Sequence, residues 1–434
     1  MFQGSKVLPR RRDPMSNNGQ RVTRTLLSLS RGGSDATHTK EFDLLTNEFV
    51  SENPFNLPEA KTSASYKSRD VLLVGTDTGP GSLTDSGYPR QIREWVRGTD
   101  FMDAPVVFEG DAKDVSVSGY INDQRLHGGP IYEIRSRSLT FYTSKYWARK
   151  VQYEELLSIH DPSRAGIVPS DDFVEVDIQD DAEVSFLANM MIISLRSDWS
   201  PNSGLTFKQG SLLYVDAESF LSKGKGACDF KVLFEPTAKT AYEYYSVTKN
   251  YVVLTTMDNV KSKLQFYKIE DGGVSLKLVG GDDEAQILNT SVSPVDQNEN
   301  DEYWFTTNGY TQPSTLCLAD AARIESEPGK GSEVCVHSIL KSLPAQYDAA
   351  GLEVSQCMAV SKDGTQVPFF LVKKKGVQMN GKTPTLLYGY GRFYSVAFYV
   401  TRSFILKFSS FVTHRRLRNF VGSELYRNCW PRLA

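Results

Sequence analysis

The segment SLLYVDAESF, residues 211–220, is one of six short segments with a strand-like pattern that recur along the chain. Each joins leucine, β-branched or aromatic side chains to polar neighbours, which is the composition of a pleated, half-buried strand. The other five are KEFDLLTNEF from Lys40, RQIREWV from Arg90, KYWARKV from Lys145, KLQFYKIEDGG from Lys263 and TLCLADAARI from Thr315.

The spacing of the six segments predicts a repeated unit. Equivalent positions follow one another at steps of 50, 54, 67, 51 and 52 residues, and the long step is expected to hold a loop insertion around residues 160–170. A period near 50 with about four strands per unit is what a β-propeller blade requires. The alternative is a long array of β-sandwiches whose spacing is accidental. The equivalent positions are Phe42, Ile92, Tyr146, Leu213, Leu264 and Leu316.

The fold expected from this period is all-β: a propeller of about seven four-stranded blades that reaches to about residue 352. The first blade is expected to be incomplete. Other short runs bounded by turn residues, such as SLTFYT at residues 138–143, are also expected to be strands.

The composition fits a folded protein and argues against several classes. Of the 434 residues 40% are hydrophobic and 23% are charged, which excludes a disordered chain. The net charge of -3 comes without a basic stripe, so no nucleic-acid partner is expected. The five Cys are widely spaced and the five His lie near no Cys pair. Reduced thiols, no metal site and no cofactor are therefore expected.

Two segments bear on location. The first 34 residues carry seven Lys or Arg and one acid, Asp13, as a transit peptide would. The apolar stretch 393–412 contains Arg402 and Lys407, each costing about 2.5–3.5 kcal/mol near a bilayer centre. We therefore expect no membrane span and a cytoplasmic protein.

The pattern changes after residue 352. Residues 355–375 are expected to form two strands around an Asp-Gly turn at 363–364, and TLLYGY, 385–390, to form a strand that ends in a glycine-rich turn. Such a strand end is typical of a functional loop in an α/β domain. The last 42 residues hold seven Lys or Arg against Glu424 and show no period. The basic tail, 394–434, is expected to be disordered.

Several short motifs could carry chemistry, and each has a simpler interpretation. The chain contains no Gly-x-Ser-x-Gly nucleophile elbow, and its nearest match, residues 32–36, is expected to be a hairpin turn. Residues 79–82 (GPGS), flanked by Asp77 and Asp85, are expected to form a turn between blades rather than a phosphate or cation site. The acid run 296–302 is expected to be a solvated hairpin tip.

The segment that most strongly indicates a functional site is residues 388–393, YGYGRF. Glycines at a strand end let the backbone approach a ligand, and a tyrosine hydroxyl there can donate a hydrogen bond to a developing oxyanion. A buried aromatic turn is the alternative, and on the residues alone it is the better interpretation.

Longer motifs resemble the prolyl oligopeptidase family. The run SKDGTQVPFFLVKKKG followed by KTPTLLYGYGRF resembles the entry into that family's catalytic domain, where the turn usually reads GYGGF. The resemblance covers roughly residues 5–393 and includes RTLLSLSRGGSDA, so the basic amino terminus is expected to be propeller strand rather than a transit peptide. Upstream motifs similar to the family's propeller are LPEAK (57–61), LLVGTDTGPGSLTDSGYPR (72–90), LRSDW (195–199), VLFEPT (232–237) and DNVKSKL (258–264).

The resemblance implies roles for two residues and a division of the chain. Tyr390 matches the tyrosine that donates to the oxyanion, and Phe393 matches an aromatic side chain that lines the proline pocket. Arg392 replaces the second glycine of the turn, and the family's Ser, Asp and His triad lies beyond the resemblance, so Ser395 and His414 are not assigned to it. The implied domains are a propeller at 1–352, the beginning of an α/β-hydrolase domain at 353–393 and the divergent tail at 394–434.

The resemblance therefore implies the propeller portion of a serine peptidase, which gates the access of short peptides to a serine active site. The catalytic triad is missing from these 434 residues, so the chain alone is expected to be inactive. Two alternatives remain: the propeller of an oligopeptidase that cleaves after basic residues, and a stand-alone propeller that serves as an interaction scaffold.

Overall fold

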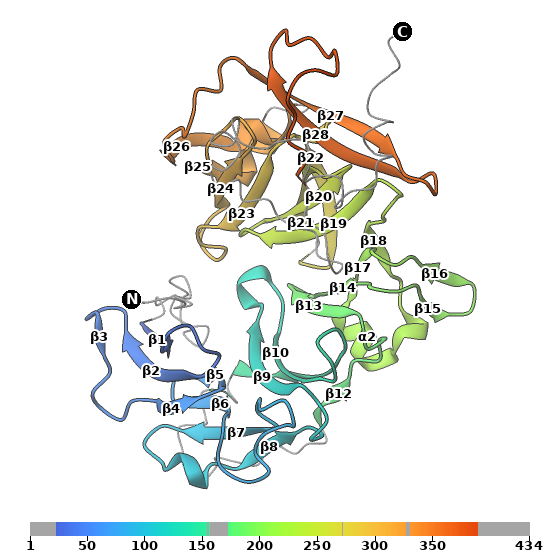
Figure 1. The fold of residues 1–434 in the computed structure, drawn as a ribbon. Helices are drawn as coiled ribbons and strands as arrows, with labels where there is room; N and C mark the ends of the chain where they lie inside the picture. The colour runs from blue at the N-terminus through green and yellow to red at the C-terminus, as the bar shows by residue number, and fades with distance from the viewer. Residues whose placement is uncertain (1–22, 154–155, 157–171, 271, 327–329, 389–434) are drawn as a thin grey trace. The chain divides into compact units, whose positions relative to one another are not determined.

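A computed structural model of the chain describes residues 23–153, 156, 172–270, 272–326 and 330–388, and strands dominate it (Figure 1). The described residues form six four-stranded sheets, in which strands close in sequence pair with one another. No helix in these ranges is long and apolar enough to cross a membrane.

The first three sheets precede residue 176. The first holds β1 (Arg24–Ser30), β2 (Thr37–Asp43), β3 (Glu48–Phe49) and β4 (Asn56–Ala60). The second holds β5 (Ser63–Ser68), β6 (Val71–Gly75), β7 (Gln91–Val96) and β8 (Val106–Glu109). The third holds β9 (Ser116–Asp123), β10 (Ile131–Ser138), β11 (Ser144–Val151) and β12 (Val174–Glu175).

The other three sheets follow in order. The fourth holds β13 (Glu183–Leu187), β14 (Met190–Ser194), β17 (Leu212–Asp216) and β18 (Lys231–Phe234). The fifth holds β19 (Thr240–Val247), β20 (Tyr251–Asp258), β21 (Lys261–Glu270) and β22 (Ser275–Gly281). The sixth holds β23 (Asn289–Pro294), β24 (Glu302–Asn308), β25 (Thr315–Asp320) and β26 (Val336–Ser342).

The remaining strands form hairpins, and one short α-helix follows the fourth sheet's third strand. Two hairpins stand outside the six sheets: β15 (Trp199–Asn202) with β16 (Leu205–Phe207), and β27 (Leu352–Val360) with β28 (Gln366–Lys374). The helix α2 (Ala217–Lys223) begins after Asp216, whose carboxylate accepts a hydrogen bond from the Ser219 amide and caps the first turn.

The period read from the sequence is confirmed, because the six equivalent positions lie in six different sheets. Five of them lie on the third strand of their sheet. Division of the chain by the period gave about seven blades, whereas the described residues form six four-stranded sheets. The long step of 67 residues, which contains the β15–β16 hairpin, exceeds the other steps by 13 to 17 residues, so the insertion accounts for about a third of one further unit.

The first sheet differs from the other five in how its described strands pair. β1 pairs with one edge of β2, and both β3 and β4 pair with the other edge, β3 at Phe42 and Asp43 and β4 between Thr37 and Lys40. Residues 23–60 therefore fill three strand positions of this sheet. Phe42 of β2 then lies one position before the last, like its equivalents in the other sheets.

One predicted strand is wrong. SLTFYT, 138–143, is the turn between β10 and β11 rather than a strand of its own. The Leu139 amide donates to the Thr143 carbonyl at 2.9 Å, and the Thr140 hydroxyl oxygen accepts the Tyr142 and Thr143 amides at 3.1 Å each. A threonine that bonds the backbone two and three residues ahead closes a turn, whatever the β-propensity of its neighbours.

The chain divides into two compact units, each described by itself. The first comprises Met1–Val253, Phe266–Val279 and Pro294–Asp301, and the second comprises Leu254–Gln265, Gly280–Ser293 and Glu302–Ala434. In the first unit an apolar core joins the third and fourth sheets. It is made by Tyr132, Ile134, Ala148, Met191, Ile193, Leu213, Val215 and Phe220, among others. Each large side chain buried there contributes about 1.5–3 kcal/mol.

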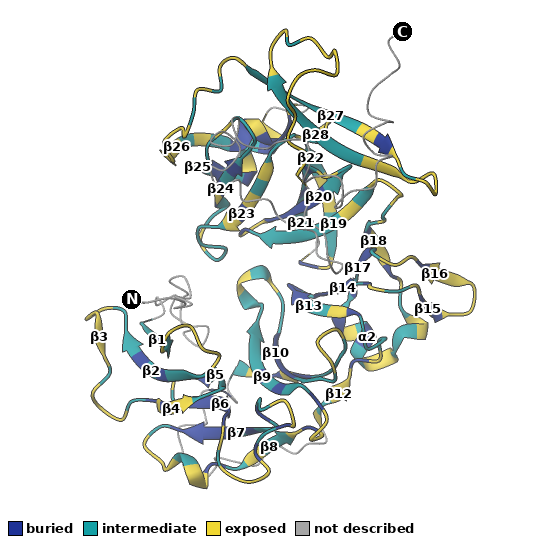
Figure 2. Ribbon diagram, in the orientation of Figure 1, coloured by how far each residue is buried: buried dark blue, intermediate teal, exposed yellow. Residues whose placement is uncertain are grey.

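Charged side chains are also buried between sheets of the first unit. Figure 2 shows β6 and β7 of this region in the dark blue of buried residues. The Glu133 carboxylate on β10 contacts Lys67 of β5 at 3.3 Å and the guanidinium groups of Arg135 and Arg149 at 2.9 Å each. Lys67 also contacts Glu94 of β7 at 2.6 Å. All five side chains are at least nine-tenths buried. They tie the second sheet to the third.

A second buried carboxylate ties the first sheet to the second. Glu41 of β2 accepts two hydrogen bonds from the Arg97 guanidinium, at 2.7 and 2.8 Å, and one from the Tyr66 hydroxyl at 2.8 Å. Arg97 also reaches Asp70 at 2.7 Å and lies over the Phe55 ring at 4.2 Å. The charge is fully paired, which is the condition for burying it.

Removal of the Glu133 charge tests this arrangement. The substitution Glu133→Gln removes the charged carboxylate that Lys67, Arg135 and Arg149 share, so we expect it to lower the free energy of unfolding by about 3–5 kcal/mol. Urea denaturation of the 434-residue chain measures the loss. The control is Lys208→Met, which removes an exposed pair with Glu235 and is expected to leave the urea midpoint unchanged. An unchanged midpoint for Glu133→Gln would contradict the role of the cluster.

The same carboxylates predict acid sensitivity. Burial alone would raise the pKa of Glu133, but the charges of Lys67, Arg135 and Arg149 outweigh it and hold that pKa below its usual 4.5. A carboxylate with a lowered folded-state pKa contributes stability that is present above its unfolded-state pKa and is lost as the pH falls towards the folded-state value. At pH values below about 4.5 we expect the urea concentration at the unfolding midpoint to decrease, and to decrease less steeply with pH in Glu133→Gln. Equal acid dependence in both chains would argue against the assignment.

Candidate functional site

The two site residues named from the sequence, Tyr390 and Phe393, lie outside the described residues, as do Arg392, Ser395 and His414. Their roles stay predictions. The structure does describe the segment that leads towards them, which consists of the β27–β28 hairpin and residues 375–388.

The β27–β28 hairpin confirms the two strands predicted around an Asp-Gly turn. Its strands pair without a break from Leu352 opposite Lys374 to Val360 opposite Gln366. Gly364 has a φ of 86°, which a residue with a side chain adopts only under strain. The Asp363 carboxylate accepts the Thr365 amide at 2.9 Å, and this hydrogen bond lowers the pKa of Asp363.

The strand predicted at 385–390 is not found where the structure describes it. Residues 385–388 have no regular structure, and Leu386, Leu387 and Tyr388 are each more than half exposed. A strand forms only when a neighbour pairs with its backbone, and no strand of the described residues pairs with this segment. Propensity alone was a poor guide here.

In the second unit the β27–β28 hairpin packs against the turns that join the second and third strands of two sheets. The Gln356 side chain on β27 donates to the carbonyl of Asn259, between β20 and β21. The Phe370 ring on β28 lies 5.3 Å from the Tyr310 ring, between β24 and β25, and the Tyr347 hydroxyl donates to the Tyr310 carbonyl. The hairpin is thus fixed at one end of these sheets.

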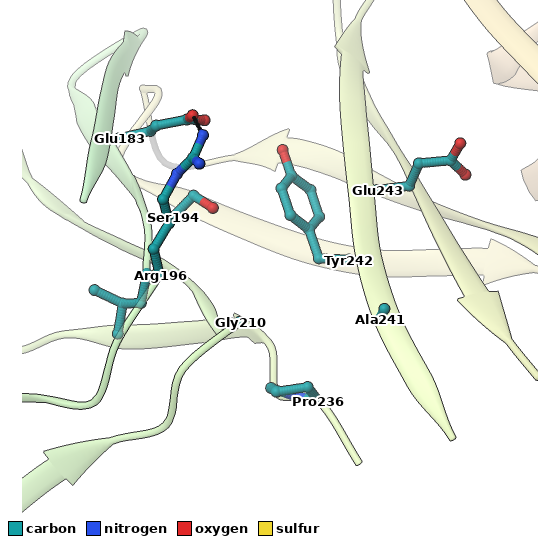
Figure 3. Close-up of a pocket in the computed structure, with 9 residues that line it drawn as sticks. Glu183, Ser194, Arg196, Gly210, Pro236, Ala241, Tyr242 and Glu243 are labelled. Atoms are coloured by element: carbon teal, nitrogen blue, oxygen red, sulfur yellow. Dashed lines mark hydrogen bonds and ion pairs between the residues drawn. The ribbon is translucent and has the colours of Figure 1, made fainter. Parts of the chain in front are cut away.

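A pocket of about 280 Å³ lies in the first unit between the fourth sheet and β19 (Figure 3). Glu183 and Arg196 form an ion pair on one wall, and Tyr242 points into the space from the other, while Glu243 points to the opposite side of β19. Burial raises the pKa of Tyr242 and of Glu243. The lining contains Ser194 but no His, so it offers polar contacts and no nucleophile with a base.

One group of side chains has the composition of a catalytic triad. The Ser338 hydroxyl lies 3.3 Å from Nδ1 of His337, whose Nε2 lies 3.5 Å from the Glu302 carboxylate. Ser338 follows His337 directly on β26, so the two side chains leave opposite faces of the strand. Neither lies on the sharp strand-to-helix turn that presents a nucleophile. The group is therefore a set of polar contacts on the sixth sheet rather than a presented nucleophile.

The acidic motifs prove to be turns. The Asp77 carboxylate accepts the Gly79 amide at 2.9 Å, and Asp85 forms an exposed pair with Lys113. Their turn joins β6 to β7 of one sheet, which corrects the expected turn between blades. The run 296–302 is more than a solvated tip, because Asp301 accepts the Thr248 hydroxyl at 2.9 Å. Within the described ranges no group of three His, Cys, Asp or Glu could hold a metal.

Comparison with known proteins gives the chain its relatives. No protein-family model matches it. An uncharacterized peptidase of Sinorhizobium fredii is 31% identical over 396 residues, which cover 91% of this chain and 48% of the relative. A solved post-proline cleaving enzyme from Rickettsia typhi superposes with a TM-score of 0.66 at 25% identity over 87% of this chain and 50% of that one. The chain belongs to the prolyl oligopeptidase family.

Other members of the prolyl oligopeptidase family share the fold at lower identity. Prolyl oligopeptidase B from Galerina marginata superposes with a TM-score of 0.54 at 14% identity, and oligopeptidase B from Leishmania major with 0.55 at 12%. The four-stranded sheets correspond to the propeller portion of these peptidases. The chain spans about half the length of the curated relatives it matches over most of its own length.

The group of Ser338, His337 and Glu302 and the pocket beside Tyr242 could not be predicted from the sequence, because no spacing of residues is typical of either.

The family assignment makes one expectation testable at once. The 434 residues contain no Gly-x-Ser-x-Gly, so no serine is presented as a nucleophile, and we expect no cleavage of a Gly-Pro reporter peptide by the purified chain. Fluorescence of the released reporter measures it. Cleavage that an active-serine reagent blocks would contradict the expectation, and loss of that cleavage in Ser338→Ala would point to the group on β26.

Proposed function

We propose that this chain is the gating propeller of a serine peptidase that cleaves short peptides after proline. The observation that carries the proposal is the match of 87% of the chain to a post-proline cleaving enzyme, together with sheets of the propeller type. The propeller's part is to limit access to the active site, so that short peptides enter and folded proteins do not. Acyl transfer would then proceed on a Ser, His and Asp triad outside this chain.

The proposed division of the chain follows the resemblance. Residues 1–352 form the propeller, 353–393 begin the α/β-hydrolase domain and 394–434 form a divergent tail. Tyr390 would donate its hydroxyl hydrogen to the oxyanion, and Phe393 would line the pocket for proline. The fixed position of the β27–β28 hairpin against the turns at Asn259 and Tyr310 supports a defined path of the chain towards these residues.

We place the protein in the cytoplasm. Cys228, Cys317, Cys335 and Cys357 are free thiols, as is usual in a reducing compartment. No cofactor, nucleic acid or membrane takes part in the proposed activity.

Two alternatives keep specific support. The likeness to oligopeptidase B, which shows the fold alone, leaves open a peptidase that prefers basic residues. A stand-alone scaffold is the other, since the 434 residues contain no nucleophile elbow. Reporter peptides that carry proline or arginine before the scissile bond separate the first alternative from the proposal.

The test uses a fusion protein. Residues 1–393 of this chain are followed by the part of the Sinorhizobium relative that lies beyond the region aligned with this chain. We expect this fusion to cleave a Gly-Pro reporter, to prefer it over an arginine reporter and to leave folded proteins intact. A second fusion carries Arg392→Gly, which restores the family turn, so that the departure at this position cannot hide activity. Preference for arginine would favour the first alternative, and inactivity of both fusions would overturn the proposal.

A substitution in the active fusion tests the role of Tyr390. Tyr390→Phe removes one hydrogen-bond donor from the oxyanion, so we expect kcat to fall about 100- to 1000-fold. KM should change little, because the hydrogen bond strengthens only in the transition state. Tyr388→Phe is the matched control and should leave kcat unchanged. A kcat for Tyr390→Phe within error of the parent would refute the assignment.

A further inference from the structure

The turn between β10 and β11 presents two adjacent aromatic side chains to solvent. Phe141 is 80% exposed and Tyr142 is 73% exposed, and Phe141 has the largest exposed fraction among the large apolar side chains of the described residues. Large apolar groups exposed side by side mark interaction surfaces more often than chance placement. Nothing in the proposed catalytic chemistry uses them.

The two rings are held in place rather than left loose. The hydrogen bonds of the Thr140 hydroxyl oxygen to the Tyr142 and Thr143 amides close the turn, and the Thr143 hydroxyl lies 2.8 Å from that of Thr140. Below the turn, β10 and β11 pair in register from Ile131 to Ser138. A preorganised tip loses little conformational freedom on binding, which favours affinity.

The charges at the base of the tip are neutralised. Arg137 and Lys145 face each other across the two strands, but Arg137 pairs with Asp114 at 2.7 Å and Lys145 with Glu175 at 3.1 Å. The tip therefore presents apolar and aromatic surface without an excess of positive charge. This suits an apolar surface of another protein region better than an anionic lipid surface.

The position of the turn in its sheet indicates which region that is. It joins the second and third strands of the third sheet. In the second unit, the turns of this same type, at Asn259 and Tyr310, contact the β27–β28 hairpin, with which the proposed hydrolase domain begins. Relatives are about twice as long as this chain, and under the proposed function their additional half is the hydrolase part that would cover further turns of this type.

We propose that Phe141 and Tyr142 form a docking tip for the hydrolase half of the peptidase, and that the rings are buried against it. The inference rests on the proposed function. It extends that function by naming the residues through which the third sheet of the propeller holds the catalytic half. The turns between third and fourth strands lie at the other end of the sheets and take no part. Leu45, 70% exposed in the turn between β2 and β3, is the matched residue there.

The experiment compares thiol labelling in two proteins: the 434-residue chain and the fusion with the relative's hydrolase half. Each carries Phe141→Cys or, as the control, Leu45→Cys, and mass spectrometry of the peptide around the substituted position follows the reaction of that thiol alone. We expect labelling at position 141 to be at least about tenfold slower in the fusion than in the chain, as for a side chain inside an interface. Labelling at position 45 should be equally fast in both.

Activity and labelling separate the two proposals. An active fusion that labels at position 141 as fast as the chain overturns the docking tip and leaves the proposed function standing. An inactive fusion with slow labelling at 141 overturns the function and supports the tip. If position 141 of the unfused 434-residue chain is labelled slowly and the rate rises on dilution, a second copy of the chain covers the tip. That result also overturns the inference.

Discussion

Three cations share two carboxylates inside the first unit, and their pairing fixes where the second sheet meets the third. Two antiparallel sheets that face each other through Leu, Ile and Val alone could slide, since apolar contact has no direction. The Glu133 carboxylate contacts Lys67, Arg135 and Arg149, so it fixes β10 against β5 at one place. Glu41 does the same for the first two sheets through Arg97. A displacement of either sheet would leave a charge buried and unpaired, which costs several kcal/mol.

The repeat and the class of fold could be read from the sequence because they depend on local patterns. Phe42, Leu213 and Leu316 recur at a period near 50 residues and lie on equivalent strands of three different sheets. The buried ion clusters could not be read, since Lys67 and Glu133 lie 66 positions apart and nothing in either neighbourhood marks burial. Charged residues are usually exposed, so a sequence gives no reason to place them in a core.

The errors have physical causes as well. Phe141 and Tyr142 favour strands by propensity, but the hydroxyl of Thr140 closes a turn around them. Leu386 and Leu387 also favour a strand, but pairing supplies the stability of a strand and no described strand pairs with them. For the candidate site, the sequence led through its resemblance to Tyr390 and Phe393, whereas the structure contributes the hairpin that leads towards them. The docking tip needed exposed fractions and sheet positions, which only the structure gives.

The claim that buried ion clusters join neighbouring sheets can be measured by hydrogen exchange of the 434-residue chain. Lys67 lies on β5, while Glu133 lies on β10 of the next sheet. If the cluster joins the sheets, Lys67→Met should speed the exchange of backbone amides in β6 and β7 and in β10 and β11 by a similar factor, because both sheets open together. Faster exchange confined to β5–β8, with β9–β12 protected as before, would contradict the account.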